Sequence, residues 1–176
     1  CEAHGAEVNG KKIGSFGDMS TFSFFLSHHI TTMEGGVLLT NNEEYYEIGK
    51  ALRAFGWIRD LKDKSELSKQ NSKLDPRFLF VNMGFNIRPT ELQGGFGIHQ
   101  IKKLEGFIKM RQDNANFWNN KLRKFSDYLQ FPEEEKNIRH VYFGYPILIK
   151  ENAPFSYKEL VDYLGSKKID TRPIMA

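Results

Sequence analysis

The sequence has little cysteine, no long apolar run and no excess of charge of one sign. Its 176 residues contain one cysteine, Cys1. This count excludes an internal disulfide, a zinc site made of cysteines and an iron–sulfur cluster bound by the chain alone. A single cysteine also suits a reducing compartment, and we expect a cytoplasmic protein. Apolar stretches such as residues 35–40 are far shorter than the roughly 20 residues that span a bilayer, so we expect no membrane partner.

The charges are balanced and well mixed. The chain has 25 Lys and Arg against 22 Asp and Glu, for a formal net charge of +3. Because the basic residues form no stripe, we expect no nucleic-acid partner. Hydrophobic residues make up 40% and aromatic residues 14% of the chain, which excludes a disordered segment and allows a substantial core at this length.

Strand-like and helix-like patterns alternate along the chain, which predicts an α/β protein. Helix starts are marked by Asn42 before two glutamates, by Thr90 after a proline, and by Ser156. Residues 61–75 are almost wholly polar and are predicted to be a loop. The predicted strands are 19–25, 37–40, 140–149 and 168–172, and the predicted helices are 43–54, 89–122 with a break near Gly106, and 156–166.

The chain is predicted to contain parts of two domains. A long helical region after an α/β part often carries a chain into its next domain, and the β-α-β pattern from residue 140 starts a second, smaller one. The sequence begins without an initiator Met inside an organised segment and stops at Ala176 in a predicted loop. We expect an internal fragment of a longer enzyme, whose site has further members outside these residues.

Residues 23–36 carry the densest group of reactive side chains, between two predicted strands. His28 and His29 are adjacent, and neighbours in an extended chain point to opposite sides, so we expect at most one of them in a site. The plainer alternative is one buried, hydrogen-bonded histidine and one at the surface. A zinc site would need further ligands at suitable spacing, and we expect no metal.

Four stretches, in this order, resemble the DegT/DnrJ/EryC1/StrS family of sugar aminotransferases that depend on pyridoxal 5'-phosphate (PLP). They are residues 2–6 leading to 14–18, residues 23–36, residues 52–57 and residues 84–93. The resemblance covers essentially the whole chain and implies the aspartate aminotransferase-like fold (fold type I) and a nucleotide-linked keto-sugar as substrate. It makes residues 1–110 the C-terminal part of the large PLP-binding domain and residues 111–176 the truncated start of the small α/β domain.

One position departs from the aminotransferases of this family. Their cofactor-binding lysine lies five residues after the phosphate-binding serine and six before the glutamate of Glu-Gly-Gly, and counting from Ser23 or from Glu34 leads to His28. An imidazole cannot hold an aldehyde as a Schiff base, but a neutral histidine suits general base chemistry near neutral pH. Histidine here marks the sugar 3-dehydratases of the family. One kind adds an iron–sulfur cluster held by cysteines, but residues 53–76 contain no cysteine, so the chain resembles the metal-free, colitose-type kind.

The resemblance therefore implies a 3-dehydratase that uses PLP and its pyridoxamine form, PMP. It would convert a nucleotide-linked 4-keto-6-deoxyhexose to the 3-deoxy sugar, with His28 as the base, and L-glutamate would restore the amino group of the cofactor. Two alternatives stay open. One is an aminotransferase for the 4-keto group, against which the missing lysine argues, and the other is a non-catalytic relative. The nucleotide and the sugar epimer are undetermined.

The resemblance also implies cofactor contacts for single residues. Ser23 would bind the cofactor phosphate and Glu2 its ring hydroxyl, while the aspartate that pairs with the ring nitrogen would lie two residues before Cys1. Asn86 would reach the phosphate of the neighbouring subunit, which implies a homodimer with shared active sites.

The substrate-side candidates are Arg53, Trp57 and Arg59. A guanidinium pairs well with a diphosphate, and an indole can stack on a base or a sugar. By contrast, His4, His29 and Glu34 are expected to be structural.

Overall fold

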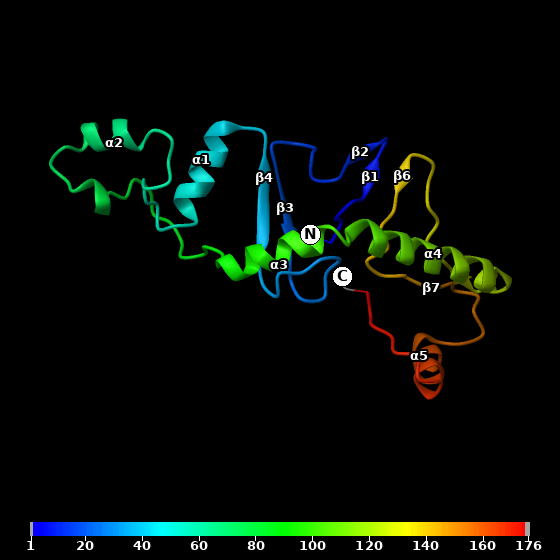
Figure 1. Cartoon of the computed structure of the whole chain (residues 1–176). Coiled ribbons are helices and arrows are strands. Elements are labelled where there is room, and N and C mark those ends of the chain that lie inside the picture. Colours follow the sequence, from blue (N-terminus) through cyan, green and yellow to red (C-terminus); the bar gives the residue numbers. More distant parts are fainter. Residues whose placement is uncertain (1, 175–176) are drawn as a thin grey trace.

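The computed structural model describes residues 2–174, and Cys1, Met175 and Ala176 lie outside the described residues. The chain forms an elongated molecule in which short strands and helices follow one another (Figure 1). Its strands pair antiparallel in the orders β2-β1-β6, β3-β4 and β5-β7. The elements are β1 (Glu7–Val8), β2 (Lys11–Lys12), β3 (Met19–Ser23), β4 (Gly36–Thr40), α1 (Glu43–Leu52), α2 (Lys64–Gln70), η1 (Pro76–Phe78), α3 (Glu91–Ile101), α4 (Leu104–Leu122), η2 (Arg123–Phe125), β5 (Leu129–Gln130), β6 (Ile138–Arg139), β7 (Leu148–Ile149) and α5 (Tyr157–Ser166).

The strands β3 and β4 form a five-residue antiparallel pair, from Met19 opposite Thr40 to Ser23 opposite Gly36. Alternating apolar and hydroxyl residues in β3 suit a half-buried strand, and the prediction of two strands here is confirmed. The connection, residues 24–35, lies at one end of the pair. Ser23, the last residue of β3, therefore lies directly before this loop.

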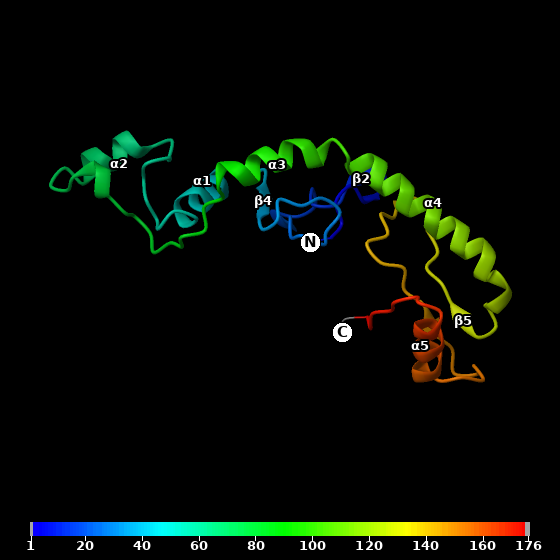
Figure 2. The same cartoon turned by 60° about the horizontal axis from the view of Figure 1, so that its bottom comes forward.

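Helices α3 and α4 follow one another along the molecule, and Figure 2 shows them as one arc above the other elements. The long predicted helix is confirmed, but its break lies at residues 102–103 and not at Gly106. Gly106 lies inside α4, and a Cβ at this position would have no atom within 4 Å. A helix tolerates such a glycine at a cost of about 1 kcal/mol. The α4 residues Leu104 and Ile108 pack against the loop between β3 and β4 in one of the two core clusters.

The other core cluster supports the region after α1. It consists of Ala51, Ile58, Leu61 and Leu79, with Leu67 packed against it. Leu67 lies on α2, so the prediction of a loop over residues 61–75 is wrong. The lysines, glutamate and glutamine of α2 are good helix formers, but one apolar residue in seven leaves no helical period to read from the sequence.

The C-terminal part holds less strand than predicted. The run 140–149 is not one strand: only its last part, β7, is paired, and Tyr142 has a left-handed backbone with φ +46° that interrupts the extended conformation. The predicted strand at 168–172 is also wrong, because Lys168 has φ +62° and residues 167–174 contain no strand.

The start of α5 is confirmed. The Ser156 side chain accepts the N–H of Glu159, and the Glu159 carboxylate accepts the N–H of Ser156, which is the reciprocal capping that the sequence pattern indicates. The division of the chain after residue 110 into two domains stays a prediction.

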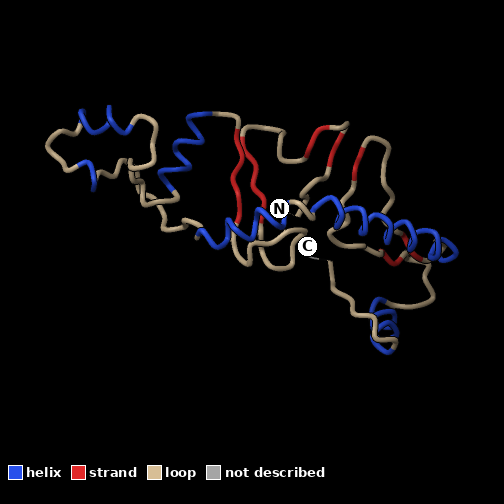
Figure 3. The backbone as a smooth tube through the Cα atoms, in the orientation of Figure 1, coloured by secondary structure: helices blue, strands red, loops and turns tan. Residues whose placement is uncertain are grey.

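Much of the chain is loop (Figure 3), and much of its apolar surface is exposed. The accessible surface is 13295 Å², whereas a compact protein of this mass would expose about 9,000 Å². Large side chains on α3, including Leu92 and Ile98, and the side chains of Met83 and Phe85 are mostly exposed. These faces are suited to packing against other protein. Among residues 2–174, no helix has the length and apolar character needed to cross a membrane.

Candidate functional site

The loop between β3 and β4 is closed by its own hydrogen bonds. Phe24 N–H donates to the Gly35 carbonyl at 2.9 Å, and Thr32 N–H donates to the Phe24 carbonyl at 3.0 Å. Gly35 has φ +144°, and a Cβ there would lie 2.6 Å from the Thr32 hydroxyl, so this position requires glycine. The Glu34 carbonyl accepts from that same hydroxyl and from the Gln93 side chain of α3, both at 2.7 Å. These hydrogen bonds therefore stabilise the conformation of the loop that carries His28 and His29.

His28 lies in this loop, and its side chain is only 11% exposed. Its Nε2 lies 3.1 Å from the Glu2 carboxylate oxygen Oε1. Its Nδ1 lies 3.3 Å from the Ser23 carbonyl oxygen. The rings of Phe25 and Phe143 meet it edge-on, with centroids 5.8 and 5.6 Å away. Each ring nitrogen thus faces one oxygen, and aromatic edges flank the ring.

His29 turns the other way, into the interior. It is 3% exposed, and its Nε2 lies 3.1 Å from the Val141 carbonyl oxygen. Burial lowers the pKa of His29, although the bond to Val141 opposes this. The two adjacent histidines therefore occupy different environments, and only His28 is placed beside a carboxylate.

His4 is a second interior histidine. Its ring packs against Phe22 and Phe24, with centroids 4.9 and 5.6 Å away, and against His29 at 6.1 Å. Burial, reinforced by the neighbouring His29 and His28, lowers the pKa of His4 to about 4. Neither ring nitrogen has a hydrogen-bond partner among residues 2–174. His4 is thus a neutral packing residue at neutral pH.

Ser23 completes the first group of predicted site residues. Its hydroxyl accepts the N–H of Phe25 at 3.3 Å at the end of β3, and its carbonyl faces His28. The structure therefore brings together Glu2, Ser23 and His28, which are three of the predicted residues.

The other four predicted residues form a second group, on two segments that pair with each other. Arg53 and Asn86 are neighbours across this pairing: Ile87 N–H donates to the Arg53 carbonyl at 3.1 Å, and Ala54 is bridged to Asn86. Both Arg53 and Asn86 are exposed. Their side chains are therefore available to a ligand or to another chain.

Trp57 and Arg59 lie further along the same segment. The Trp57 ring stacks on Phe80 with centroids 5.7 Å apart, and its Nε1 donates to the Arg77 carbonyl at 3.0 Å. The Arg59 guanidinium lies over the Trp57 ring, 4.3 Å from the centroid. This cation–π contact arranges a planar cation and an indole face side by side.

Two glycines allow these segments to approach each other. Gly56 has φ +83°, and a Cβ there would lie 1.7 Å from the Asn82 carbonyl oxygen. A Cβ on Gly84 would lie 2.3 Å from the Gly56 nitrogen. Only glycine fits at either position, which explains physically why both occur in the motifs of this region.

The two groups lie apart within one chain. Figures 1 and 2 place the region around α2 and the end of α1 toward one end of the molecule, while the loop between β3 and β4 lies near its middle. A site that used both groups would need them to come from two copies of the chain.

The residues present fit a cofactor that is held without a covalent bond. The loop at residues 24–35 contains no lysine, but it offers a hydroxyl at a strand end for a phosphate and a half-buried carboxylate beside an imidazole. Among residues 2–174, no three His, Cys, Asp or Glu side chains are grouped to hold a metal ion.

Sequence reasoning missed the residues that hold the two histidines from outside the loop. These are Val141 and Phe143, which contact them, and Arg111, whose guanidinium donates to the carbonyls of Tyr142 and Phe143. They lie more than 80 positions from His28 in the chain, and no local pattern marks such contacts.

Comparison with known proteins agrees with this geometry. The sequence pattern of the DegT/DnrJ/EryC1/StrS aminotransferase family matches residues 1–176. The chain is 41% identical over 177 residues to the GDP-4-keto-6-deoxy-D-mannose 3-dehydratase of Escherichia coli O55:H7, covering 99% of this chain and 45% of that protein. It is 42% identical over 178 residues to the enzyme of the same name from Yersinia pseudotuberculosis, with 99% and 44% covered.

The fold agrees as well. The solved structure of the E. coli GDP-4-keto-6-deoxy-D-mannose 3-dehydratase with bound hydrated PLP superposes with a TM-score of 0.88 at 42% identity, covering 99% of this chain and 44% of that one. The predicted α/β, aspartate aminotransferase-like fold is thereby confirmed. The chain spans less than half the length of these relatives.

Proposed function

Because the chain belongs to the DegT/DnrJ/EryC1/StrS aminotransferase family, we propose that it acts in a PLP/PMP-dependent nucleotide-sugar 3-dehydratase. The substrate would be a nucleotide-linked 4-keto-6-deoxyhexose. GDP-4-keto-6-deoxy-D-mannose is the first candidate, because two relatives at 41–42% identity are named as 3-dehydratases of this sugar. The observation that carries the proposal is His28 at the lysine position, with its Nε2 3.1 Å from Glu2. The single cysteine suits a cytoplasmic location.

Ser23 and Glu2 would hold the cofactor without a covalent bond. The Ser23 hydroxyl would donate to the phosphate at the end of β3, and the Glu2 carboxylate would bind the ring hydroxyl. When bound, the pyridoxamine form supplies an amino group for the sugar ketone and an electron sink. L-Glutamate would return that amino group after each turnover.

His28 would move the protons. The Ser23 carbonyl and the Glu2 carboxylate both only accept hydrogen bonds, and the working tautomer is proposed to carry its proton on Nδ1, toward Ser23. The other nitrogen, Nε2, is then the one that takes up a proton and returns it, on the side where Glu2 lies. The Glu2 carboxylate oxygen lies 3.1 Å from this nitrogen. One histidine can therefore serve as the base and then assist departure of the C3 hydroxyl as an acid.

The working unit is proposed to be a homodimer with shared sites. Two observations support it: the region around the end of α1, to which the segment of Asn86 is bridged, lies apart from the loop between β3 and β4 within one chain, and the exposed apolar surface is large. In the dimer, Asn86 of one copy would approach the phosphate held by Ser23 of the other. Arg53, Trp57 and Arg59 would bind the nucleotide diphosphate and its sugar.

Mass spectrometry of the products tests the proposal. The full-length protein, with PLP and glutamate, is incubated with CDP-, GDP- and dTDP-linked 4-keto-6-deoxy sugars. We expect a 3-deoxy-4-keto product from one of them and a 10²–10⁴-fold slower reaction in His28→Asn, the usual loss for a general base. His29→Asn is the matched control and should change stability more than rate. A 4-amino sugar as the product would establish the aminotransferase alternative instead, and wild-type dehydration by His28→Asn would remove His28 from its role.

A further inference from the structure

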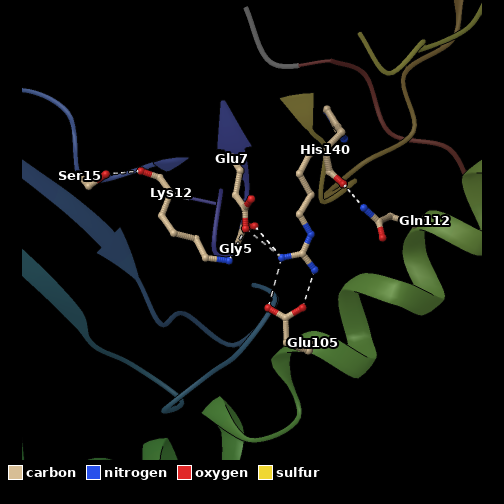
Figure 4. A network of polar contacts seen from close by, with 8 residues as sticks. Gly5, Glu7, Lys12, Ser15, Glu105, Gln112 and His140 are labelled. Carbon is tan, nitrogen blue, oxygen red and sulfur yellow. Dashed lines mark hydrogen bonds and ion pairs between the residues drawn. The ribbon is translucent and has the colours of Figure 1, made fainter. Parts of the chain in front are cut away.

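Helix α4 holds the segment 139–143 at several points. The Arg139 guanidinium pairs with Glu105 at the start of the helix and also donates to the Gly5 carbonyl at 3.2 Å. About two turns further along, the Gln112 side chain donates to the His140 carbonyl at 2.9 Å. Figure 4 shows Glu105 and Gln112 reaching from the helix toward this segment. The segment is therefore tied to α4 along its length.

Arg111 also binds this segment, and it does so twice. Its Nη1 donates to the carbonyls of both Tyr142 and Phe143, at 3.0 Å each. Tyr142 is 5% exposed and has φ +46°, a conformation that costs a non-glycine residue about 1–2 kcal/mol and that persists only when its surroundings enforce it. The two bonds from Arg111 fix the carbonyl of Tyr142 itself and that of the next residue, Phe143.

Around this bend, the segment contacts both His28 and His29. The Val141 carbonyl accepts from His29, and the Phe143 ring lies 5.6 Å from the His28 ring at an interplanar angle of 85°. The Phe143 ring also lies 5.7 Å from His29. The aromatic contact matters for His28, because its hydrogen bond to the Ser23 carbonyl is long, at 3.3 Å, and does not fix the ring plane alone.

We propose that Phe143, held in place by Arg111, is a positioning residue that sets the ring orientation of His28. This inference rests on the proposed role of His28 as the base. The groups that face the His28 ring are Glu2, Phe25, the Ser23 carbonyl and Phe143, of which only Glu2 is ionisable. Arg111 acts through the backbone, because its bonds go to the carbonyls of Tyr142 and Phe143.

Paired variants of the full-length protein test the inference by kinetics. Phe143→Leu removes the aromatic edge and keeps most of the volume, whereas Phe143→Tyr keeps the ring. We expect kcat to fall about 10- to 100-fold in Phe143→Leu and in Arg111→Gln, the size expected when a reacting group is misplaced, with KM little changed. Phe143→Tyr and Arg111→Lys should recover most of the rate. Arg123→Gln removes the same charge at the far end of α4 and should match the wild type.

Nuclear magnetic resonance on protein labelled with ¹⁵N-histidine provides a readout that does not need activity. The ring nitrogens of His28 are assigned with His28→Asn. In Phe143→Leu and Arg111→Gln, the His28 ring signals should shift and broaden as the ring gains freedom, while those of His4 stay in place. Unchanged His28 signals in both variants would overturn the inference, even if their melting temperatures fall.

The two experiments separate this inference from the proposed function. A wild-type protein that dehydrates no nucleotide sugar would remove the function, but the ring signals would still decide whether Phe143 orients His28. If Phe143→Leu does not fold, Phe143→Met takes its place with the same expectation.

Discussion

The Glu2 carboxylate and the His28 imidazole lie 3.1 Å apart although 26 positions separate them in the chain. The carboxylate comes from the segment before β1, and the imidazole comes from the loop after β3. The pair is thus assembled from two segments of the chain, with His28 mostly buried and Glu2 about one-third exposed.

This pair predicts the effect of Glu2→Gln. The amide keeps the size of the side chain but removes the charge that lies 3.1 Å from His28 Nε2, so we expect the dehydration rate to fall by about 10-fold or more. Cofactor retention should also weaken, since Glu2 is proposed to bind the ring hydroxyl. Absorbance of bound cofactor after gel filtration measures retention, and product formation measures rate. Wild-type values for both quantities would show that the pair has no part in the site.

Mixed dimers test the shared site. Asn86→Ala and His28→Asn are each expected to inactivate a homodimer, but a mixed dimer has one site with both native residues. Exchange of subunits between the two purified variants should therefore restore a fraction of the activity. The control is a double variant that carries both changes in one chain, mixed with wild type, in which both sites lose one residue. No recovery in dimers shown by mass spectrometry to have exchanged would argue that Asn86 is a structural residue of its own chain.

The glycine at the close approach of the substrate-side segments gives a stability prediction. Gly56→Ala places a Cβ against the Asn82 carbonyl and also forces a left-handed alanine. Gly10→Ala shares the positive φ, at +73°, but has nothing within 4 Å. We expect Gly10→Ala to lower the free energy of unfolding by about 1–2 kcal/mol, the conformational cost alone, and Gly56→Ala to lower it by considerably more. Urea denaturation compares the two variants, and equal losses would contradict the clash.

The sequence predicted the parts of the fold that are encoded locally. The strand pair β3–β4, the Asn42 cap of α1 and the capping box at Ser156 each follow from a few adjacent residues. One of the failures comes from a contact between distant elements. In residues 140–149 the β-branched and aromatic side chains favour a strand, but Tyr142 has a left-handed backbone, and Arg111, on another element, binds the carbonyls of Tyr142 and Phe143. A contact over 31 positions overrides the local preference.

In the candidate site, too, local features could be predicted from the sequence and contacts between distant residues could not. The resemblance, counted from Ser23 and Glu34, predicted His28 as the site histidine, and the structure places its ring beside Glu2. Spacing did not reveal which of two adjacent histidines is buried, since that depends on the Val141 carbonyl, 112 positions away. It also did not reveal Phe143, whose neighbours in the sequence resemble an ordinary strand.

The interior histidines predict how stability depends on pH. Burial is the main cause of the lowered pKa values of His4, to about 4, and of His29 and His140, whereas an imidazole in the unfolded chain titrates near 6.5. Between about pH 6.5 and 4 the unfolded chain therefore binds more protons than the folded one, and the free energy of unfolding should fall as the pH is lowered through this range. Above about pH 6.5 these groups are neutral in both states and add no pH dependence.

In His4→Leu, an apolar side chain replaces a ring whose nitrogens have no partner among residues 2–174, so stability at pH 7.5 should be kept or increased. The loss between pH 7.5 and 5 should be smaller than in the wild type, as measured by urea denaturation at each pH. A loss as large as in the wild type would show that His4 is not a source of the pH dependence.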